Sequence, residues 1–242
     1  MLTNLPLFVA LVFGLSTLLV LLLFVGAVRK SSSATIALQS NIIAIGLVGW
    51  LGFQAGLTMS GIYQAGMPPP KILIFGVLPA LVTILVLFLT RRGRVFIDSL
   101  PLRQITYVNT VRVLVELVLY WLCLYKAVPL IMTFEGANFD ILAGITAPIV
   151  AYFAFRKPFL SRAVVTGLLA WNVVCLGLLL TIVRFALLSA PTPFQQFGFE
   201  QPNIAIAYFP FSWLPTFIVP VILFGHLASI RQLWTRLARS SE

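Results

Sequence analysis

Two charged residues, Arg112 and Glu116, stand one helical turn apart in the apolar stretch YVNTVRVLVELVLYW, residues 107–121. A charged side chain near the middle of a bilayer costs about 2.5–3.5 kcal/mol on insertion scales, so neither residue should face lipid. Ionisable residues inside a membrane often mark a substrate or ion path, a proton relay or a buried pair. The two residues therefore predict a polar site within a helical bundle, with Glu116 as its protonatable group.

Further polar residues continue on the same face of this predicted helix. Residues three or four positions apart lie on one side of an α-helix. The polar residues with this spacing are Thr106, Asn109, Arg112, Glu116, Tyr120 and Cys123. An arginine four residues before a glutamate is the less favourable order for an ion pair, and a guanidinium has five donors, more than one carboxylate can satisfy. We therefore expect other helices to contribute to the site.

Depth along the helices ranks the partners that Arg112 can reach. At a rise of 1.5 Å per residue, Arg112 lies about 13 Å from the helix end that follows Arg103. Asn172 lies at about the same depth in a later apolar segment, which makes it the expected partner. His226 and Asn41 both lie within about 10 Å of their helix ends, and we expect them to pair with each other. The predicted binding residues are Arg112, Glu116, Asn109, Asn172 and Tyr120.

Seven apolar segments must position these residues. They cover residues 5–28, 36–62, 72–90, 105–127, 139–155, 163–188 and 211–230. Most reach the roughly 20 residues that a helix needs to cross about 30 Å of hydrocarbon. Only 9% of the residues are charged, against about 25% in soluble domains. The sequence predicts an all-α integral membrane protein whose single domain, residues 1–242, is a bundle of seven transmembrane helices.

The basic residues predict the orientation of this bundle. If the N-terminus lies outside, the inner loops hold twelve of the sixteen Lys and Arg residues, as the positive-inside rule requires. Lys71, Lys126 and Arg184 then lie outside. We predict a multi-pass protein of the cell membrane, N-terminus outside and C-terminus inside, whose basic side faces anionic lipid headgroups. The net charge of +10 therefore does not indicate a nucleic acid partner.

Two segments on the predicted outer side carry polar residues that face the mouth of the bundle. They are residues 133–140, TFEGANFD, and the Pro- and Phe-rich residues 189–210. The outer charges that we expect to form a gate are Glu135, Asp140, Arg184 and Glu200. Loops over a rigid scaffold often carry function, so residues 189–210 are either a gate or a static cap.

Glycines and prolines predict how the helices pack and bend. Gly46, Gly49, Gly52 and Gly56 share one face of the second segment. Small residues let a neighbouring backbone approach closely, so tight helix packing is expected there. The prolines inside predicted helices are Pro79, Pro148, Pro215 and Pro220. Each removes a backbone hydrogen bond, which neighbouring groups are expected to replace.

The sequence identifies no cofactor or metal site. All four lysines stand at helix ends, which leaves no mid-helix lysine for retinal, and a single histidine cannot ligate haem from both sides. The zinc motif HExxH is missing, and the two distant cysteines, Cys123 and Cys175, form no metal pattern. With no nucleophile pattern either, an enzyme is the less expected class.

Three functions remain open. The first is binding or transport of a small molecule or ion at the polar site around Arg112 and Glu116. The second is a receptor or accessory protein, in which the same network is structural and the outer loops contact a partner. The third is an intramembrane enzyme acting on lipid, with Glu116 as acid or base and His226 as helper. The sequence favours the first function and leaves the oligomeric state open.

Overall fold

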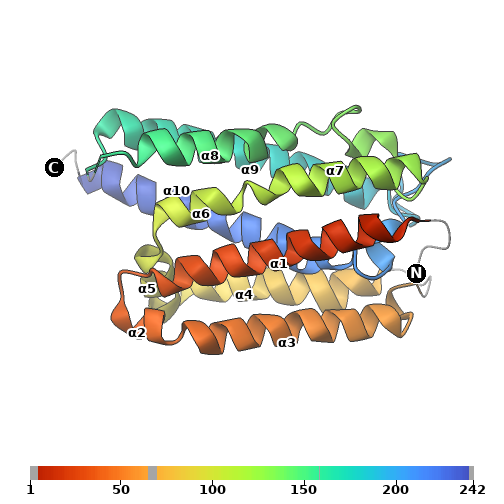
Figure 1. Ribbon diagram of the computed structural model, residues 1–242, viewed down its shortest axis with the longest axis horizontal. Helices are drawn as coiled ribbons and strands as arrows, with labels where there is room; N and C mark the ends of the chain where they lie inside the picture. The colour runs from red at the N-terminus through yellow and green to blue at the C-terminus, as the bar shows by residue number, and fades with distance from the viewer. Residues whose placement is uncertain (1–4, 65–69, 158, 240–242) are drawn as a thin grey trace.

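A computed structural model describes residues 5–64, 70–157 and 159–239 of the chain, and every regular element within them is helical (Figure 1). The long helices run side by side along one common direction, with α10 between the other helices (Figure 1). The predicted all-α class is confirmed.

All seven predicted apolar segments contain helix. The α-helices are α1 (Leu7–Arg29), α2 (Ala34–Leu38), α3 (Ser40–Met59), α4 (Leu78–Leu89), α5 (Arg91–Ser99), α6 (Leu102–Val108), α7 (Val111–Leu124), α8 (Ile141–Ala154), α9 (Arg162–Leu188) and α10 (Val219–Arg239). The short 3-10 helices are η1 (Ile62–Gln64), η3 (Leu130–Met132) and η4 (Ala205–Ala207). Two π-helical turns, η2 (Leu73–Val77) and η5 (Leu214–Ile218), lead directly into α4 and α10.

Five helical stretches of the described chain are long and apolar enough to cross a membrane. They are Leu7–Arg29, Ser40–Met59, Leu102–Leu124, Arg162–Leu188 and Leu214–Arg239. A sixth candidate joins Leu73–Leu89 to α5 across a bend of 93°. The apolar helix α8, at 14 residues, is shorter than a full span. Length and composition thus support five to six candidate spans, where seven were predicted.

The helix α8 is short because the chain before it turns back into the bundle. After α7 ends, residues 125–140 run back beside it, and Asp140 contacts Arg112 in the first turn of α7. Thr133, Asn138 and Asp140 are all buried along this segment. Irregular backbone at membrane depth is tolerated where it is buried in protein, so this segment can complete the path of α8 with only the short 3-10 turn η3 and no α-helix.

Side chains of α3 replace two of the hydrogen bonds that prolines remove. Pro79 has no N–H for the carbonyl of Phe75, four residues earlier, and Gln54 Nε2 donates to that oxygen at 2.9 Å. Pro220 likewise leaves the carbonyl of Thr216 free, and Trp50 Nε1 donates to it at 2.9 Å. The predicted repair by neighbouring groups is confirmed at these two prolines.

The expected tight packing on the glycine face of α3 is wrong. A Cβ atom at Gly46, Gly49, Gly52 or Gly56 would meet no described atom within 4 Å, and all four residues are exposed. The close approach occurs instead between α7 and α8, where a Cβ at Gly144 would lie 2.7 Å from the backbone nitrogen of Val113. Spacing identifies a small face, but it does not identify which neighbour covers it.

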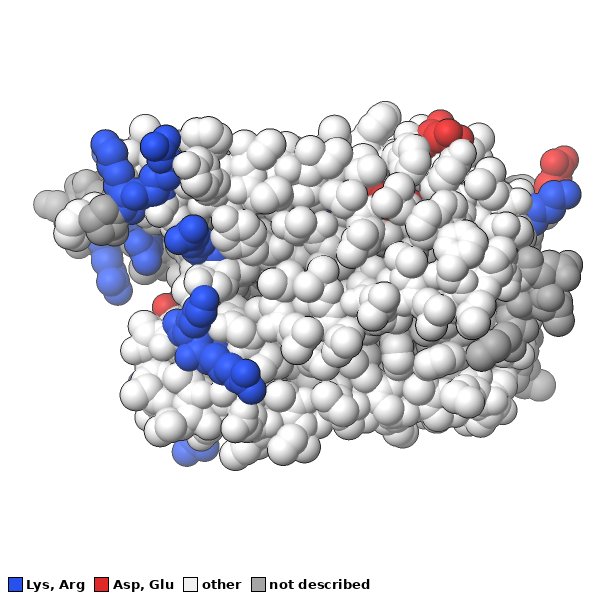
Figure 2. Space-filling view, in the orientation of Figure 1, with Lys and Arg blue, Asp and Glu red and all other residues white. Residues whose placement is uncertain are grey.

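The basic residues gather at one end of the helices, which we call the basic end (Figure 2). This end includes α5 and the last turns of α10, and the middle of the surface in this view carries almost no charge (Figures 1 and 2). A smaller group of charges lies at the opposite end (Figure 2). The molecule therefore has a basic end, and the face seen in this view is nearly uncharged in its middle (Figure 2).

Candidate binding site

Arg112 lies in the first turn of α7, just after the break that separates α6 from α7, and its side chain is 1% exposed. Asn109 occupies this break and is also buried. Its Nδ2 group donates to the carbonyls of Ile105 and Thr106 at 3.4 and 3.3 Å. These bonds leave the Oδ1 atom of Asn109 available to Arg112 and satisfy backbone acceptors at the break.

All five guanidinium donors of Arg112 have an acceptor. Nε donates to Asp140 Oδ2 at 2.7 Å, and Nη2 donates to Asp140 Oδ1 and to the carbonyl of Cys175, the latter at 3.2 Å. Nη1 donates to Asn109 Oδ1 at 3.4 Å and to His226 Nε2 at 3.0 Å. Because a guanidinium has five N–H groups, this buried cation is fully satisfied. The expectation that other helices contribute is confirmed.

The contact with Arg112 fixes which nitrogen of His226 carries the proton. A guanidinium can only donate, so His226 Nε2 must accept, and a ring that accepts at Nε2 holds its proton at Nδ1. That proton points to Asn172 Oδ1, which lies 2.9 Å from Nδ1. Asn172 in turn donates to the carbonyl of Leu168 at 2.9 Å. His226 is therefore neutral here and joins Asn172 to Arg112.

Glu116, one turn further along α7, is satisfied at only one of its oxygens. It is 1% exposed, and Oε1 accepts a hydrogen bond from Asn138 Nδ2 at 2.6 Å. Oε2 is buried and has no hydrogen-bond partner among the described residues. Asn138 also accepts from the backbone N–H of Asp140 at 3.0 Å. Through Asn138, Glu116 belongs to the same network as the Arg112–Asp140 pair.

A cavity of about 280 Å³ lies beside these charged groups. Its polar lining residues are Arg112, Glu116 and Asp140. The rest of its wall is aliphatic or proline and comes from η2, α4, α7, η3, α9, η4, η5 and α10. Volumes near 300 Å³ are typical of the smallest ligand pockets. The cavity can hold a small, largely apolar molecule next to a carboxylate.

Irregular backbone surrounds this cavity. The π-helical turns η2 and η5 both line the cavity. The α6–α7 break and the end of residues 133–140 also reach it, through Arg112 and Asp140 respectively. Single π-helical turns occur frequently at functional sites. Discontinuous helices near the membrane midplane also form the substrate sites of many transporters. The same small region thus combines the buried charges with most of the helix interruptions.

Four of the five predicted binding residues meet in this network, although not with the expected pairing. Arg112 forms its ion pair with Asp140, and Glu116 bonds to Asn138. Asn109 contacts Arg112 directly, whereas Asn172 reaches it through His226. The fifth, Tyr120, lies further along α7 and packs against the ring of Phe134, with centroids 5.2 Å apart.

The expected pairing of His226 with Asn41 is wrong. Asn41 accepts from Arg29 at 3.1 Å on the exposed side of α3, whereas His226 contacts Arg112 and Asn172. The depth estimate failed because α10 continues to Arg239. Thirteen residues separate His226 from that end, which places it about 20 Å along the helix. His226 therefore lies level with Arg112 instead of near the basic end.

The four charges predicted for the outer gate do not form ion pairs with one another in the described structure. Asp140 is buried in the Arg112 network, and Glu135, Arg184 and Glu200 are exposed, with no ion pair to another described residue. Residues 189–210 are held by hydrogen bonds instead. Gln201 donates to the carbonyl of Cys123 at 2.9 Å, and Ile204 N–H donates to that of Ala127 at 3.1 Å. These bonds support a fixed cap.

Two groups of the network are not foreseen from the sequence. Asn138 joins Glu116 to Asp140, and the carbonyl of Cys175 accepts from Arg112. A signal for Asn138 exists, because an Asn two residues before a helix-preceding Asp often bonds to local backbone. A backbone carbonyl gives no sequence signal. Among the described residues, no three His, Cys, Asp or Glu side chains gather to hold a metal ion.

The apolar helices and the buried charges together indicate an all-helical membrane protein. A family model described as Domain of unknown function (DUF8737) matches residues 69–234, more than half of the chain. The chain belongs to this family, and the matched range includes every residue of the Arg112 network. The comparisons with curated proteins and with solved structures found no match.

Proposed function

We propose that the protein is a seven-helix protein of the cell membrane that binds or moves a small molecule or ion at the Arg112–Glu116–Asp140 site. The N-terminus lies outside and the C-terminus inside. The gathering of Lys and Arg at the basic end supports this orientation. The burial of Thr133, Asn138 and Asp140 supports counting residues 133–140 with α8 as one crossing.

The unpartnered oxygen of Glu116 is the observation that carries the proposal. A buried polar atom without a hydrogen bond costs about 1–3 kcal/mol, so native structures seldom keep one without a reason. Oε2 of Glu116 is such an atom, and Glu116 lines the 280 Å³ cavity. A donor group of a bound molecule, or a proton, would satisfy this oxygen.

Charge balance defines the class of ligand. Arg112 and Asp140 neutralise each other, and His226 is neutral in its bonded tautomer. An ionised Glu116 therefore adds one uncompensated negative charge to a buried cluster. Buried charges need a partner, and the surrounding wall is apolar. The fitting ligand is a small molecule with an apolar body and one ammonium or N–H group, or a proton alone.

Arg112 itself has a structural role in this proposal. Its five donors are all used by the protein, so it has none left for a ligand. Because all of its donors bond to the protein, Arg112 alone would fit the receptor or accessory function, in which the network is a scaffold. Glu116 separates the two functions, because it lines the cavity and its second oxygen is used by no described group of the protein.

A binding experiment with benzylammonium tests the proposal. This probe joins an apolar ring to one cationic donor group. We expect benzylammonium to raise the melting temperature of the purified wild-type protein. It should not change the melting temperature of Glu116→Gln, because the glutamine NH2 group is a donor in the place of the accepting Oε2 atom. Ser229→Ala is the matched control, since Ser229 also carries a buried unpartnered oxygen but does not line the cavity.

Proton flux into vesicles that contain a pH-sensitive dye tests the alternative in which the proton alone is the ligand. We expect Glu116→Gln to abolish flux and Ser229→Ala to retain it. Wild-type protein that neither responds to benzylammonium nor conducts protons, or a Glu116→Gln variant that behaves as wild type in both assays, would contradict the proposal. The scaffold function would then be preferred.

A reporter experiment tests the seven-helix count and the orientation. A reporter fused after Glu242 should report the cytoplasm, and one inserted at residues 189–210 should report the outside, because the basic end belongs on the inner side. The control is a reporter between α5 and α6, after Ser99, which should also report the cytoplasm. An external C-terminus together with a cytoplasmic reporter after Ser99 would refute the four crossings predicted between these two positions.

A further inference from the structure

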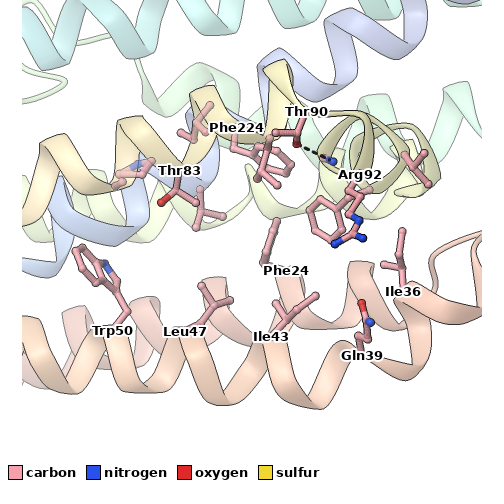
Figure 3. Close-up of a pocket in the computed structure, with 18 of the residues that line it drawn as sticks. Phe24, Ile36, Gln39, Ile43, Leu47, Trp50, Thr83, Thr90, Arg92 and Phe224 are labelled. Atoms are coloured by element: carbon pink, nitrogen blue, oxygen red, sulfur yellow. Dashed lines mark hydrogen bonds between the residues drawn. The ribbon is translucent and has the colours of Figure 1, made fainter.

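A second and larger cavity opens between α3 and α4, separate from the Glu116 cavity. It has a volume of about 1100 Å³, and we call it the α3–α4 groove (Figure 3). Its middle is lined by apolar residues of both helices and floored by α10. The lining residues include Ile43, Leu47 and Trp50 of α3, the hydroxyl-bearing Thr83 of α4, and Phe224 of α10. Ligand pockets usually measure about 300–1,000 Å³, so this groove suits a larger molecule.

The basic end of the groove is built by the sharp turn from α4 into α5. The two helices meet at 93°, and Thr90 caps α5 by accepting from the N–H of Gly93 at 3.1 Å. A Cβ atom at Gly93 would collide with the backbone of Leu87, so the turn requires a glycine there. This turn places the first residues of α5, Arg91 and Arg92, on the groove wall.

Arg91 and Arg92 bring positive charge without a counter-charge. Both are exposed, and neither is in an ion pair with a described carboxylate. The acid of α5, Asp98, is bonded to Arg231 instead. Figure 3 shows the Arg92 side chain reaching from α5 toward Gln39, across the end of the groove. Uncharged hydrogen-bonding residues at the same end are Ser33, Thr35, Gln39 and Thr90.

The length of the groove matches half a bilayer. From Ser40 to Trp50, α3 rises by about 15 Å, and the hydrocarbon core of a membrane is about 30 Å thick. Trp50 lines the far end of the groove, where its indole is fixed by a hydrogen bond to the carbonyl of Thr216. An acyl chain that enters beside Arg92 can therefore extend through one leaflet before it reaches Trp50.

We propose that the α3–α4 groove binds one anionic phospholipid from the leaflet at the basic end. The phosphate lies between Arg91 and Arg92, and an acyl chain follows Ile43 and Leu47 toward Trp50. Basic residues beside a membrane attract anionic lipids, and guanidinium groups match phosphate geometry. The apolar middle of the groove supplies the matching surface for the chain. This lipid site does not depend on the function proposed for Glu116.

Native mass spectrometry of the full-length protein tests the site with two lipids that share the same acyl chains. These are dioleoyl phosphatidylglycerol, which is anionic, and dioleoyl phosphatidylcholine, which has no net charge. We expect the first bound phosphatidylglycerol to be held at least about tenfold more tightly by wild type than by the double variant Arg91→Gln, Arg92→Gln. Phosphatidylcholine binding should change less than twofold in that variant.

Filling the groove tests the position of the acyl chain. Leu47→Trp should abolish the tightly held lipid, and Val48→Trp should retain it, because Val48 is exposed but does not line the groove. Thr83→Phe fills the groove from α4 and serves as the second variant if Leu47→Trp does not fold. Retention of tight binding in the folded groove-filling variant would overturn the proposed chain position.

A charge control separates a defined site from general attraction. Arg156 and Lys157 are also exposed basic residues, but they do not line the groove. The double variant Arg156→Gln, Lys157→Gln should therefore keep the affinity for phosphatidylglycerol within twofold of wild type. An equal loss in this control, or no loss in the Arg91 and Arg92 variant, would overturn the proposed lipid site.

Discussion

The surroundings of Arg112 and the surroundings of α3 are built on opposite principles. Around Arg112, every guanidinium donor has a partner, and α8 approaches α7 so closely that Gly144 has no room for a Cβ atom. On α3, the glycine face has no described neighbour. Only 17% of the residues in the most apolar part of α3 are buried, against 56% in Leu214–Arg239, which contains α10. The region around Arg112 is closely packed and hydrogen-bonded except at Glu116 Oε2, whereas the glycine face of α3 is left open.

The difference follows from what each region carries. A buried charge needs complete hydrogen bonding, because an uncompensated one is strongly destabilising. An apolar helix has no such need in a membrane, because lipid tails are as apolar as its own side chains. The close packing is therefore concentrated where the charges are. The open side of the molecule keeps surface available for lipid.

The largest expected effect comes from removing the buried cation. Arg112→Met should lower the free energy of unfolding by about 3–5 kcal/mol, because Asp140 then remains buried without its partner. Asp140→Leu should have a similar effect. The double variant should recover much of the loss, since a buried pair replaced by apolar residues is often close to neutral.

Chemical unfolding in detergent measures the free energies of the four proteins. Losses that simply add in the double variant would show that Arg112 and Asp140 serve separate partners. Arg112 and Asp140 would then not be one energetically coupled pair.

A matched pair of glycine substitutions gives the next largest effect. Gly144→Ala should destabilise the fold by about 1–3 kcal/mol, the usual range for overpacking, because the new Cβ meets the backbone of Val113. Gly52→Ala should cause no loss, because its Cβ meets nothing in the described structure and alanine is the better helix former. Melting temperatures of the two variants in the same detergent compare the regions directly. A greater loss at Gly52 would show that α3 has a covering partner.

The smallest effect is expected at the exposed ion pair of the basic end. Arg231 and Asp98 form two hydrogen bonds of 3.1 Å, but both side chains are partly exposed. Exposed pairs contribute about 0.2–1 kcal/mol, so Asp98→Asn should change stability no more than that. The same unfolding assay measures it beside Arg112→Met. A loss as large as that of the buried pair would show that charge burial does not set the difference between the regions.

The positions of the helices could be predicted from the sequence, because apolar runs and breakers are local signals. The need for several partners around Arg112 could also be predicted, since five donors exceed one carboxylate. The partners themselves could not. Asp140 reaches Arg112 only because residues 133–140 turn back into the bundle, and a depth scale that starts each helix at a membrane surface places Asp140 outside.

The ends of helices and the cover of faces were the other failures. The apolar run ends at residue 230, so a depth scale based on it places His226 too near the basic end, whereas α10 continues through amphipathic turns to Arg239. Because small residues permit close packing, the glycine spacing of α3 predicts a neighbouring helix on that face. The spacing of small residues is a local property of the sequence, whereas the presence of a neighbouring helix depends on the whole fold.

The two hydrogen bonds that α3 makes to proline-freed carbonyls have a mechanical consequence. Trp50 and Gln54 are fixed to Thr216 and Phe75 in the second half of α3, and Thr58 is bonded to Ser212 at 2.7 Å beyond them. The first half of α3 borders the groove and lacks comparable bonds to α4. Side-chain hydrogen bonds therefore hold the second half of α3 to the chain around both prolines, whereas in the first half Asn41 bonds to Arg29 of α1. By freeing these two carbonyls, the prolines of α4 and α10 supply the acceptors that hold α3 beside the groove.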